Sequence, residues 1–355
     1  MPSTPTHDFL HDLPKCEHHI HIEGTLSPDL LFSLASANNV ALPVEHDPSF
    51  ASPAALRSRY ARFSSLDDFL HYYFIGFTVL LTADDFERLT YAYLEGAYAH
   101  GLRHAEVFFD PQAHTDRGVS YETVVAGMSA ARARAASQLP DLSVMLIPCV
   151  VRHLPVSSGL EMLRTVVDAG HFRDGTVAGL GLSSTEKGMD PARFAPIYDA
   201  ARRHGVPRLT AHYGEEGPAA YVRDALSVLG VSRIDHGRRV VEDPDLVAAL
   251  AESRTLLTLC PVSNVVLRGV DRVEDVPVRA LLDAGVPFSI NSDDPAYFGA
   301  DLVQNYYAVQ DAFNLSFDEW ETIARSAIDG SWCDDARKTV LHGMVTDVIG
   351  KWKSP

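Results

Sequence analysis

The sequence predicts an α/β fold of the (β/α)8 TIM-barrel type, with extra helices after the first strand and at the C-terminus. Short apolar runs of strand length alternate with segments of helical period along nearly the whole chain. The length of 355 residues suits one barrel, and no repeat or linker divides the chain. Unusual polar residues collect where the strands end, which is where such barrels carry their sites. We therefore expect residues 1–355 to form a single barrel domain.

The first predicted strand lies within residues 14–24, PKCEHHIHIEG. Side chains alternate along a strand, so His19, His21 and Glu23 share one face while His18 lies on the other. Two neutral imidazoles two positions apart on one face can bind the same metal ion. By itself a His-x-His stretch is often incidental, so this pattern needs support from elsewhere in the chain.

Seven further strands are predicted at residues 103–110, 143–151, 176–183, 208–213, 233–236, 256–260 and 287–291. Helices are predicted at residues 29–37, 65–81, 83–100, 121–138, 157–169, 191–204, 218–229, 244–252, 276–284 and 334–351. Ser27-Pro28 is a cap followed by proline at the first helical position, which marks the start of the first of these helices. Residues 40–64 contain Pro43, Asp47 and Pro53, and we expect a loop or lid there. Alternating strands and helices favour parallel strands with right-handed crossovers.

Composition limits the partners. The formal net charge of −17 argues against binding of nucleic acid or an anionic membrane through general attraction. The four cysteines are scattered, which is typical of reduced thiols in a cytosolic protein. The N-terminus has no basic start followed by an apolar core. We expect a cytoplasmic protein, with the nucleus as a second location, that binds a small molecule; the oligomeric state is left open.

The ends of three predicted strands present four candidate metal ligands, His19, His21, His212 and Asp293. Three nitrogens and one oxygen suit zinc and leave room for a water molecule. Taken singly, each stretch also fits a surface turn, a helix cap or a structural histidine. Because the four residues fall at strand ends of one barrel, we predict that they converge on a metal ion.

Five motifs, in this order, together resemble the adenosine deaminase type of purine deaminase within the metal-dependent amidohydrolases. They are HIHIEGT at 19–25, HYGE at 212–215, HG at 236–237, CPVSN at 260–264 and NSDDP at 291–295. The resemblance implies a zinc ion held by His19, His21, His212 and Asp293. It also implies catalytic roles for Glu215 and His236, and purine contacts from Asp294 and the backbone amide of Ser184.

The implied reaction replaces the exocyclic amine at C6 of a purine with oxygen and releases ammonia. Zinc lowers the pKa of a bound water to about 7. A protonated Glu215 donates to N1 of the ring, and His236 orients or deprotonates the water. Residues 181–186, GLSSTE, stand where binuclear relatives place a bridging lysine, and Lys187 comes too late. One zinc ion per chain is therefore expected.

Three features look more like the adenine deaminase branch, with a role in purine salvage. They are FFDPQ at 108–112, the doubled Glu215-Glu216, and GLGL at 179–182. A free base presents an N9–H that needs an acceptor, for which Glu23 and Asp110 are candidates.

The chain departs from the family pattern at Ser183 and Tyr213. Adenosine and N6-substituted adenine therefore stay open as alternative substrates. From other classes, an amidohydrolase acting on an amide or phosphoester, or a non-catalytic barrel, also stays open.

Overall fold

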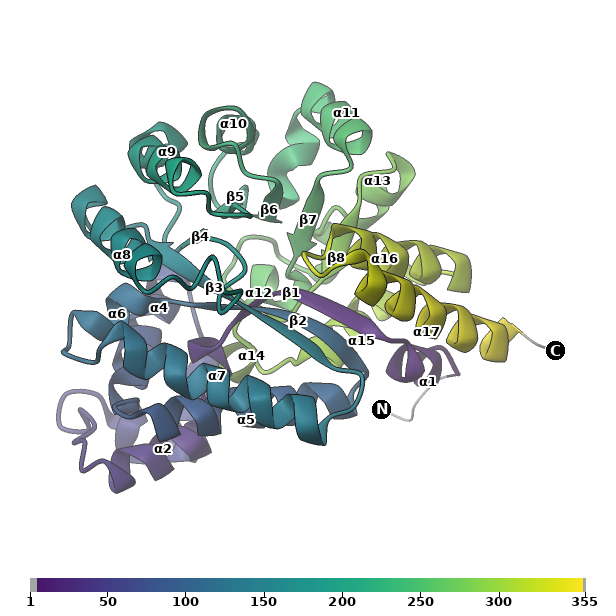
Figure 1. The fold of residues 1–355 in the computed structure, drawn as a ribbon. Coiled ribbons are helices and arrows are strands. Elements are labelled where there is room, and N and C mark those ends of the chain that lie inside the picture. The colour runs from purple at the N-terminus through teal and green to yellow at the C-terminus, as the bar shows by residue number, and fades with distance from the viewer. Residues whose placement is uncertain (1–4, 354–355) are drawn as a thin grey trace.

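A computed structural model describes residues 5–353, and its fold is the predicted α/β barrel (Figure 1). The eight strands are β1 Lys15–His21, β2 Leu102–Phe109, β3 Ser143–Val151, β4 Gly181–Ser183, β5 Thr210–Tyr213, β6 Arg233–His236, β7 Leu256–Leu259 and β8 Phe288–Ile290. All pairings between them are parallel, in the orders β1-β2-β3-β4 and β5-β6-β7-β8. The predicted fold class is confirmed.

Two single parallel bridges join these four-stranded sheets. One pairs Leu180 with Leu209, between the β4 and β5 regions, and the other pairs Ile20 with Asp293, between β1 and the end of β8. At the second seam the Asp293 amide donates to the His19 carbonyl, and the His21 amide donates to the Asp293 carbonyl, both at 3.1 Å. The strands thus follow one another in chain order around a closed ring.

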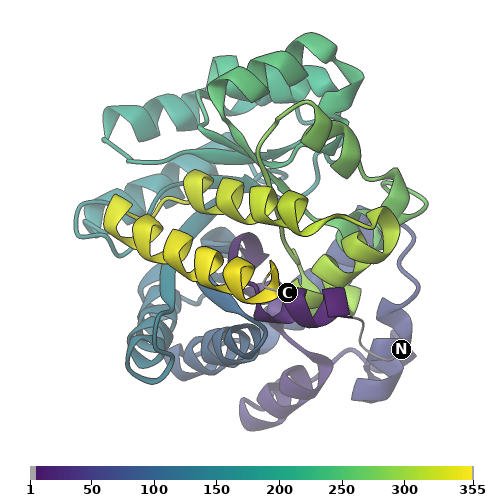
Figure 2. The same cartoon turned by 90° about the vertical axis from the view of Figure 1, so that its right-hand side faces the viewer.

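Helices surround the strands. They are α1 Pro5–Asp12, α2 Pro28–Ala37, α3 Pro53–Tyr60, α4 Leu66–Gly76, α5 Ala83–Ala99, α6 Pro111–Thr115, α7 Tyr121–Gln138, α8 Val156–Asp168, α9 Ala195–Arg203, α10 Ala219–Asp224, α11 Pro244–Ser253, α12 Pro261–Val266, α13 Val278–Asp283, α14 Pro295–Phe298, α15 Leu302–Phe313, α16 Phe317–Gly330 and α17 Asp335–Lys353. Short 3-10 turns occupy Glu23–Thr25, Pro48–Ala51, Phe77–Val79, Pro191–Phe194, Arg238–Glu242 and Val273–Asp275, and a π turn occupies Ala225–Leu229. The closing helices α16 and α17 run side by side next to α1 (Figure 2). Within residues 5–353, no helix is both long and apolar enough to cross a membrane.

Helix starts follow the expected cap chemistry. The Ser27 side chain accepts a hydrogen bond from the Leu30 amide, and Pro28 opens α2. Thr82 and Asp85 form a reciprocal capping box at the start of α5. Because these caps satisfy amides that a helix leaves unpaired, local sequence sets where the helices begin.

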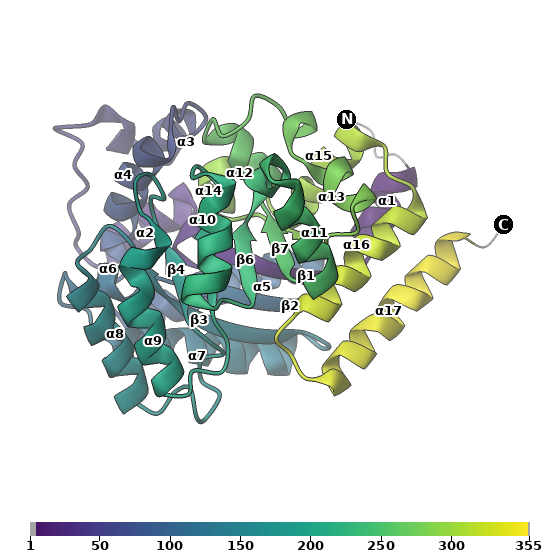
Figure 3. The ribbon, with the colours of Figure 1, turned by 90° about the horizontal axis from the view of Figure 1, so that it is seen from above.

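The prediction of a loop or lid at residues 40–64 is wrong in part. This stretch contains the 3-10 turn Pro48–Ala51 and helix α3, and it buries Phe50, Leu56 and Tyr60. The Tyr60 ring stacks on Tyr297 of α14 at 4.6 Å between centroids. Figure 3 shows α3 and α4 together at one side of the molecule. Buried aromatic contacts thus make α3 part of the core, despite its prolines.

The predicted fourth strand at residues 176–183 is shortened to β4, Gly181–Ser183. A side chain at Gly179 would meet the Arg208 carbonyl oxygen at 2.4 Å from its Cβ, so the chain passes very close to its neighbour just before β4. The approach joins the two sheets through the Leu180–Leu209 bridge. The two sheets are joined here by close backbone packing and a single bridge, without a longer run of strand pairing.

A buried ion pair crosses the barrel interior. The guanidinium of Arg233 on β6 donates to the carboxylate of Glu106 on β2, and both side chains are almost completely buried. Glu106 also contacts His104 Nε2 at 3.1 Å and accepts from the Trp332 amide. Burial alone would raise the pKa of Glu106, but the charge of Arg233 and the His104 contact hold it below its ordinary value. This pair therefore stays ionised inside the barrel.

Replacing Glu106 with glutamine should lower the free energy of unfolding by about 3–5 kcal/mol, because it leaves the buried Arg233 charge without its partner. Denaturant unfolding followed by circular dichroism measures the change. The control is Glu161→Gln, which removes a carboxylate from an exposed pair with Arg164 and should leave the unfolding free energy unchanged. Equal stabilities for the two variants would contradict the account.

Candidate metal and catalytic site

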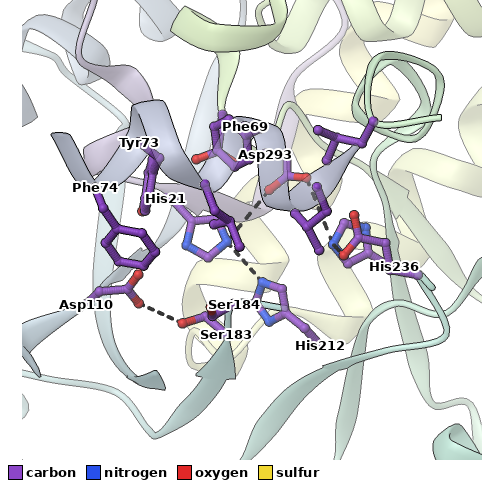
Figure 4. Close-up of a pocket in the computed structure, with 15 residues that line it drawn as sticks. His21, Phe69, Tyr73, Phe74, Asp110, Ser183, Ser184, His212, His236 and Asp293 are labelled. Carbon is purple, nitrogen blue, oxygen red and sulfur yellow. Dashed lines mark hydrogen bonds and ion pairs between the residues drawn. The ribbon is translucent and has the colours of Figure 1, made fainter. Parts of the chain in front are cut away.

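A pocket opens at the carboxyl ends of the strands (Figure 4). Its lining residues are His21, Leu66, Phe69, Leu70, Tyr73, Phe74, Asp110, Ser183, Ser184, His212, Glu215, His236, Leu267, Asp293 and Asp294. The apolar members come mainly from helix α4. This helix therefore covers the site, whereas the sequence predicted a lid in the preceding stretch. An apolar cover over polar strand ends keeps water away from the chemistry.

Three imidazoles and one carboxylate meet on the pocket floor. His21 Nε2 lies 2.9 Å from His212 Nε2, and Asp293 Oδ1 lies 3.3 Å from His19 Nε2 and 3.7 Å from His21 Nε2. Ligands bound at roughly 2.0–2.1 Å in a tetrahedron lie roughly 3.3 Å from one another. His19 Nε2 is fully buried and has no hydrogen-bond partner. The donor atoms of His19, His21 and His212 thus lie within 4.8 Å of one another, and Asp293 reaches two of these three imidazoles. Their donor types are those that a small divalent metal accepts.

The protonation states also fit a metal. Burial lowers the pKa of His21 to about 4 and that of His212 well below its ordinary value, so both imidazoles are neutral and keep a free lone pair. Burial alone would raise the pKa of Asp293, but the neighbouring imidazoles, His19 foremost, hold it well below its ordinary value. The neutral nitrogens of His21 and His212 beside the carboxylate of Asp293 make a donor set of the zinc type.

A second layer holds these ligands. Thr258 Oγ1 lies 2.8 Å from His19 Nδ1, and Asp235 Oδ2 lies 3.3 Å from His212 Nδ1. Ser263 Oγ donates to Asp293 Oδ2 at 2.6 Å. Such partners fix the orientation of the rings and the carboxylate. None of these three residues was predicted to have a role, although Ser263 lies inside the CPVSN motif and Asp235 directly precedes the HG motif.

His236 sits beside this cluster in a strained conformation. Its φ is +66°, and Asp293 and Ser184 also have positive φ values of +66° and +79°. Residues other than glycine adopt such angles at a cost and cluster at functional positions. His236 and Cys260 form, with two of the predicted ligands, a second overlapping set of donor atoms within 4.8 Å of one another. Three of the site residues are therefore held in backbone conformations that local preference does not favour.

Glu215 lies on the turn after β5 and reaches the same pocket. Its Oε2 is 3.5 Å from His236 Nε2, and the residue is 7% exposed. Burial, reinforced by the charge of Asp293, raises the pKa of Glu215 well above its ordinary value. Burial therefore favours the neutral carboxylic acid of Glu215, the form that can donate a proton to a bound molecule.

Two further acids line the pocket where a substrate ring would lie. Ser183 Oγ donates to Asp110 Oδ1 at 2.8 Å, and burial together with the charge of Glu23 raises the pKa of Asp110 to about 8. Asp294 Oδ1 is buried without a partner, and burial beside Asp293 raises the pKa of Asp294 well above its ordinary value. A buried acid with an unpartnered oxygen, such as Asp294, suits a ligand that brings its own donors and acceptors.

Glu23 is not among the lining residues. Its carboxylate accepts from the Asp110 amide at 3.0 Å and contacts His114 Nε2 at 2.8 Å. The strand ends at His21, so Glu23 no longer follows the alternation that placed it on the face of His19 and His21. Next to it, a Cβ on Gly24 would lie 2.0 Å from Asp294 Oδ1, so only glycine leaves room for that acid.

The remaining predicted positions are also placed. Ser184 lines the pocket, and its Oγ lies 2.8 Å from His153 Nδ1. Tyr213 is fully buried away from the pocket, where its ring lies 4.6 Å from the Arg152 guanidinium. Lys187 is exposed and is not among the residues that line the pocket. Tyr213 therefore does not narrow the pocket.

Parallel strands that carry imidazole and carboxylate donors at their carboxyl ends are the architecture of a metal-dependent amidohydrolase. The chain belongs to the adenosine deaminase family, whose family model matches residues 14–348. The family assignment from the sequence motifs is confirmed.

Several relatives match over nearly the full length. An adenine deaminase of Aspergillus fumigatus is 52% identical over 99% of this chain and 99% of its own. The solved adenine deaminase of Arthrobacter aurescens is 42% identical, with a TM-score of 0.89 over 95% of this chain and 99% of its own. A zinc-bound amidohydrolase from Burkholderia ambifaria is 28% identical, with a TM-score of 0.87 over 99% of this chain and 94% of its own.

Replacing His212 with alanine should remove most of the bound metal, because it deletes one of the converging nitrogens. Elemental analysis of the purified variant measures the metal content per chain. The control is His342→Ala, a partly exposed histidine that pairs with Asp329 on the surface and should leave the content unchanged. Full metal content in His212→Ala would remove this residue from the ligand set.

Proposed function

We propose that this protein is a zinc-dependent hydrolase that converts adenine to hypoxanthine and ammonia, a reaction of purine salvage. The observation that carries the proposal is the buried carboxyl of Glu215, whose Oε2 lies 3.5 Å from His236 Nε2, beside the cluster of imidazole donors and Asp293. Relatives that match nearly the whole chain at about half identity are adenine deaminases. A small-molecule purine is the partner that these features imply.

The proposed cofactor is one zinc ion per chain, held by His19, His21, His212 and Asp293. The donor set and the zinc-bound relative support this choice of metal. When bound, zinc supplies a water whose pKa is about 7. A bridging lysine for a second ion is absent from β4, and the side chain of Lys187 is exposed.

The catalytic roles follow from the protonation states. Water adds to C6 of the purine, and the ring then gains electron density at N1. The carboxylic acid of Glu215 donates its proton there. Burial lowers the pKa of His236 well below its ordinary value, so its neutral imidazole can orient the attacking water and accept a proton from it. The proton that His236 took from the water passes to the exocyclic nitrogen, the C6–N bond breaks and ammonia leaves. The proton of the C6 hydroxyl returns to Glu215 as the carbonyl forms.

Asp294 and Asp110 would orient the ring. A protonated Asp294 donates to N7, which is an acceptor in adenine. Asp110 has its Oδ1 bound by Ser183, so in its ionised form, which a pKa of about 8 leaves within reach at neutral pH, its Oδ2 accepts the N9–H of a free base. We assign this role to Asp110 in place of Glu23, which supports the Asp110 backbone from behind. The backbone amide of Ser184 would contact N3. In adenosine, ribose replaces the N9–H, and the buried acceptor loses its donor.

Three further expectations remain predictions. Residues 1–355 form one deaminase domain, and the protein works in the cytoplasm, with the nucleus as a second location. Its partners include neither nucleic acid nor membrane. These expectations rest on composition, on the charge of −17 and on the continuous family match.

Ammonia release from adenine, adenosine and N6-substituted adenines, measured side by side, tests the substrate. We expect adenine to have the highest kcat/KM, by roughly tenfold or more over adenosine, because only the free base satisfies Asp110. A preference for adenosine or an N6-substituted adenine would replace the proposed substrate. Ammonia from none of them, with hydrolysis of an amide or phosphoester, would replace the reaction. No turnover of any compound would indicate a non-catalytic barrel.

The matched variant in this panel is Asp110→Asn, which keeps the shape of the side chain but reduces its ability to accept from N9–H. Its advantage for adenine over adenosine should fall by about tenfold. An unchanged ratio would remove Asp110 from the recognition of N9.

Glu215→Gln should keep the metal and lose most turnover, roughly 10²- to 10⁴-fold in kcat, because an amide cannot supply the acid proton. Steady-state kinetics and elemental analysis on the same sample measure both properties. Near-normal kcat with full metal content would show that another group protonates the ring.

A further inference from the structure

The backbone amides of the turn that carries Glu215 bind a single buried carboxyl group, that of Glu186. Glu186 follows β4 and is 1% exposed. Its Oε1 accepts from the Gly214 amide at 2.9 Å, and its Oε2 accepts from the Glu215 amide at 3.0 Å and the Glu216 amide at 2.8 Å. The amides of three consecutive residues therefore donate to one side chain from the loop after β4. The side chain of Glu186 thus satisfies three backbone donors that have no other partner in the turn.

Two glycines make this arrangement possible. Gly214 has a φ of +74°, which turns the chain sharply after His212 and Tyr213. A Cβ on Gly217 would lie 2.3 Å from Glu186 Oε1, so the chain closes over the carboxylate only because residue 217 has no side chain. The loop thus fits around Glu186 with no space to spare.

The opposite side of the turn is clamped by the loop after β6. The Arg239 amide donates to the Gly214 carbonyl at 3.1 Å, and the Arg239 guanidinium donates to the Glu216 carbonyl at 2.6 Å. With the amides on Glu186 and the carbonyls on Arg239, both edges of the turn are fixed. Glu215 projects into the pocket, and Glu216 lines only an adjoining cavity with Arg238 and Asn264.

We propose that Glu186 is a positioning residue for the reaction, which sets the place of the Glu215 carboxyl by binding the three amides of residues 214–216. The inference rests on the proposed role of Glu215 as the acid. Proton transfer needs donor and acceptor within hydrogen-bond reach, and a misplacement of about 1 Å costs on the order of 10²-fold in rate. Solvent cannot substitute for the carboxylate, because the site is buried.

The variant Glu186→Gln tests the proposal because glutamine keeps the shape of the glutamate side chain. An amide has one acceptor oxygen and turns an N–H₂ toward a backbone donor, so at least one of the three bonds is lost. We expect kcat for adenine to fall on the order of 10- to 100-fold, with KM and metal content unchanged. Hydrogen exchange at the amides of residues 214–216 should become faster. Lys187→Gln, which removes a charge from the exposed neighbour, is the control and should alter none of these.

A double-mutant cycle separates positioning from general stability. If Glu186 acts through Glu215, then Glu186→Gln should add little loss to a protein that already carries Glu215→Gln. The inference would be overturned if the fold-loss in kcat of the double variant equalled the product of the two single losses. A wild-type kcat in Glu186→Gln would also overturn it. Full activity of Glu215→Gln would instead refute the proposed role of Glu215 as the acid. Hydrogen exchange at residues 214–216 would still show whether Glu186 holds these amides.

Gly217→Ala provides a second route if Glu186→Gln does not fold. Its new methyl group displaces the carboxylate without changing its charge. The same pattern of lower kcat, unchanged metal content and faster exchange at residues 214–216 is expected. Wild-type kcat combined with faster exchange in this variant would show that the bonds from Glu186 do not position the Glu215 carboxyl, and would overturn the inference.

Discussion

The seam between β1 and β8 is the contact on which the site depends. The barrel closes there through two backbone hydrogen bonds, between Asp293 and the strand residues His19 and His21. These three residues are also proposed metal ligands. The backbone contacts that close the barrel therefore also bring these three proposed ligands together. The positive φ of Asp293 is a cost that the closed ring imposes on this position.

Burial then sets the charge of each group. In one water-poor pocket, the pKa values of His21 and His212 are lowered, that of Asp293 is lowered, and those of Glu215 and Asp294 are raised. Each state follows from whether the group has an opposite charge beside it or only apolar cover and like charge. The helix α4 provides that cover with the rings of Phe69, Tyr73 and Phe74. Separated protonation states of neighbouring acids allow one site to offer both an acid and a base.

Much of this arrangement follows from the chain alone, because it depends on local pattern. Short apolar runs ending in histidine or aspartate predicted the strands and their direction, and the parallel barrel brings such ends together. The parts that sequence did not predict depend on contacts between distant segments. Glu186 has no local feature that distinguishes it from a solvated glutamate, since its role appears only when β4 and β5 lie side by side.

The errors have similar causes. Helix α3 follows two prolines, yet its buried face packs on α14, and that contact outweighs the local signal for a loop. Alternation placed Glu23 beside the metal ligands, but the strand stops two residues earlier and the side chain turns toward His114. Neither a strand end nor a partner on another helix can be read from spacing.

A crystal of the zinc-loaded protein, with anomalous diffraction collected on both sides of the zinc absorption edge, tests the central claim most directly. The account predicts one anomalous peak per chain, within bonding distance of His19, His21 and His212 Nε2 and of Asp293. A peak bound instead through His236 and Cys260, two peaks in the pocket, or no peak there would contradict it.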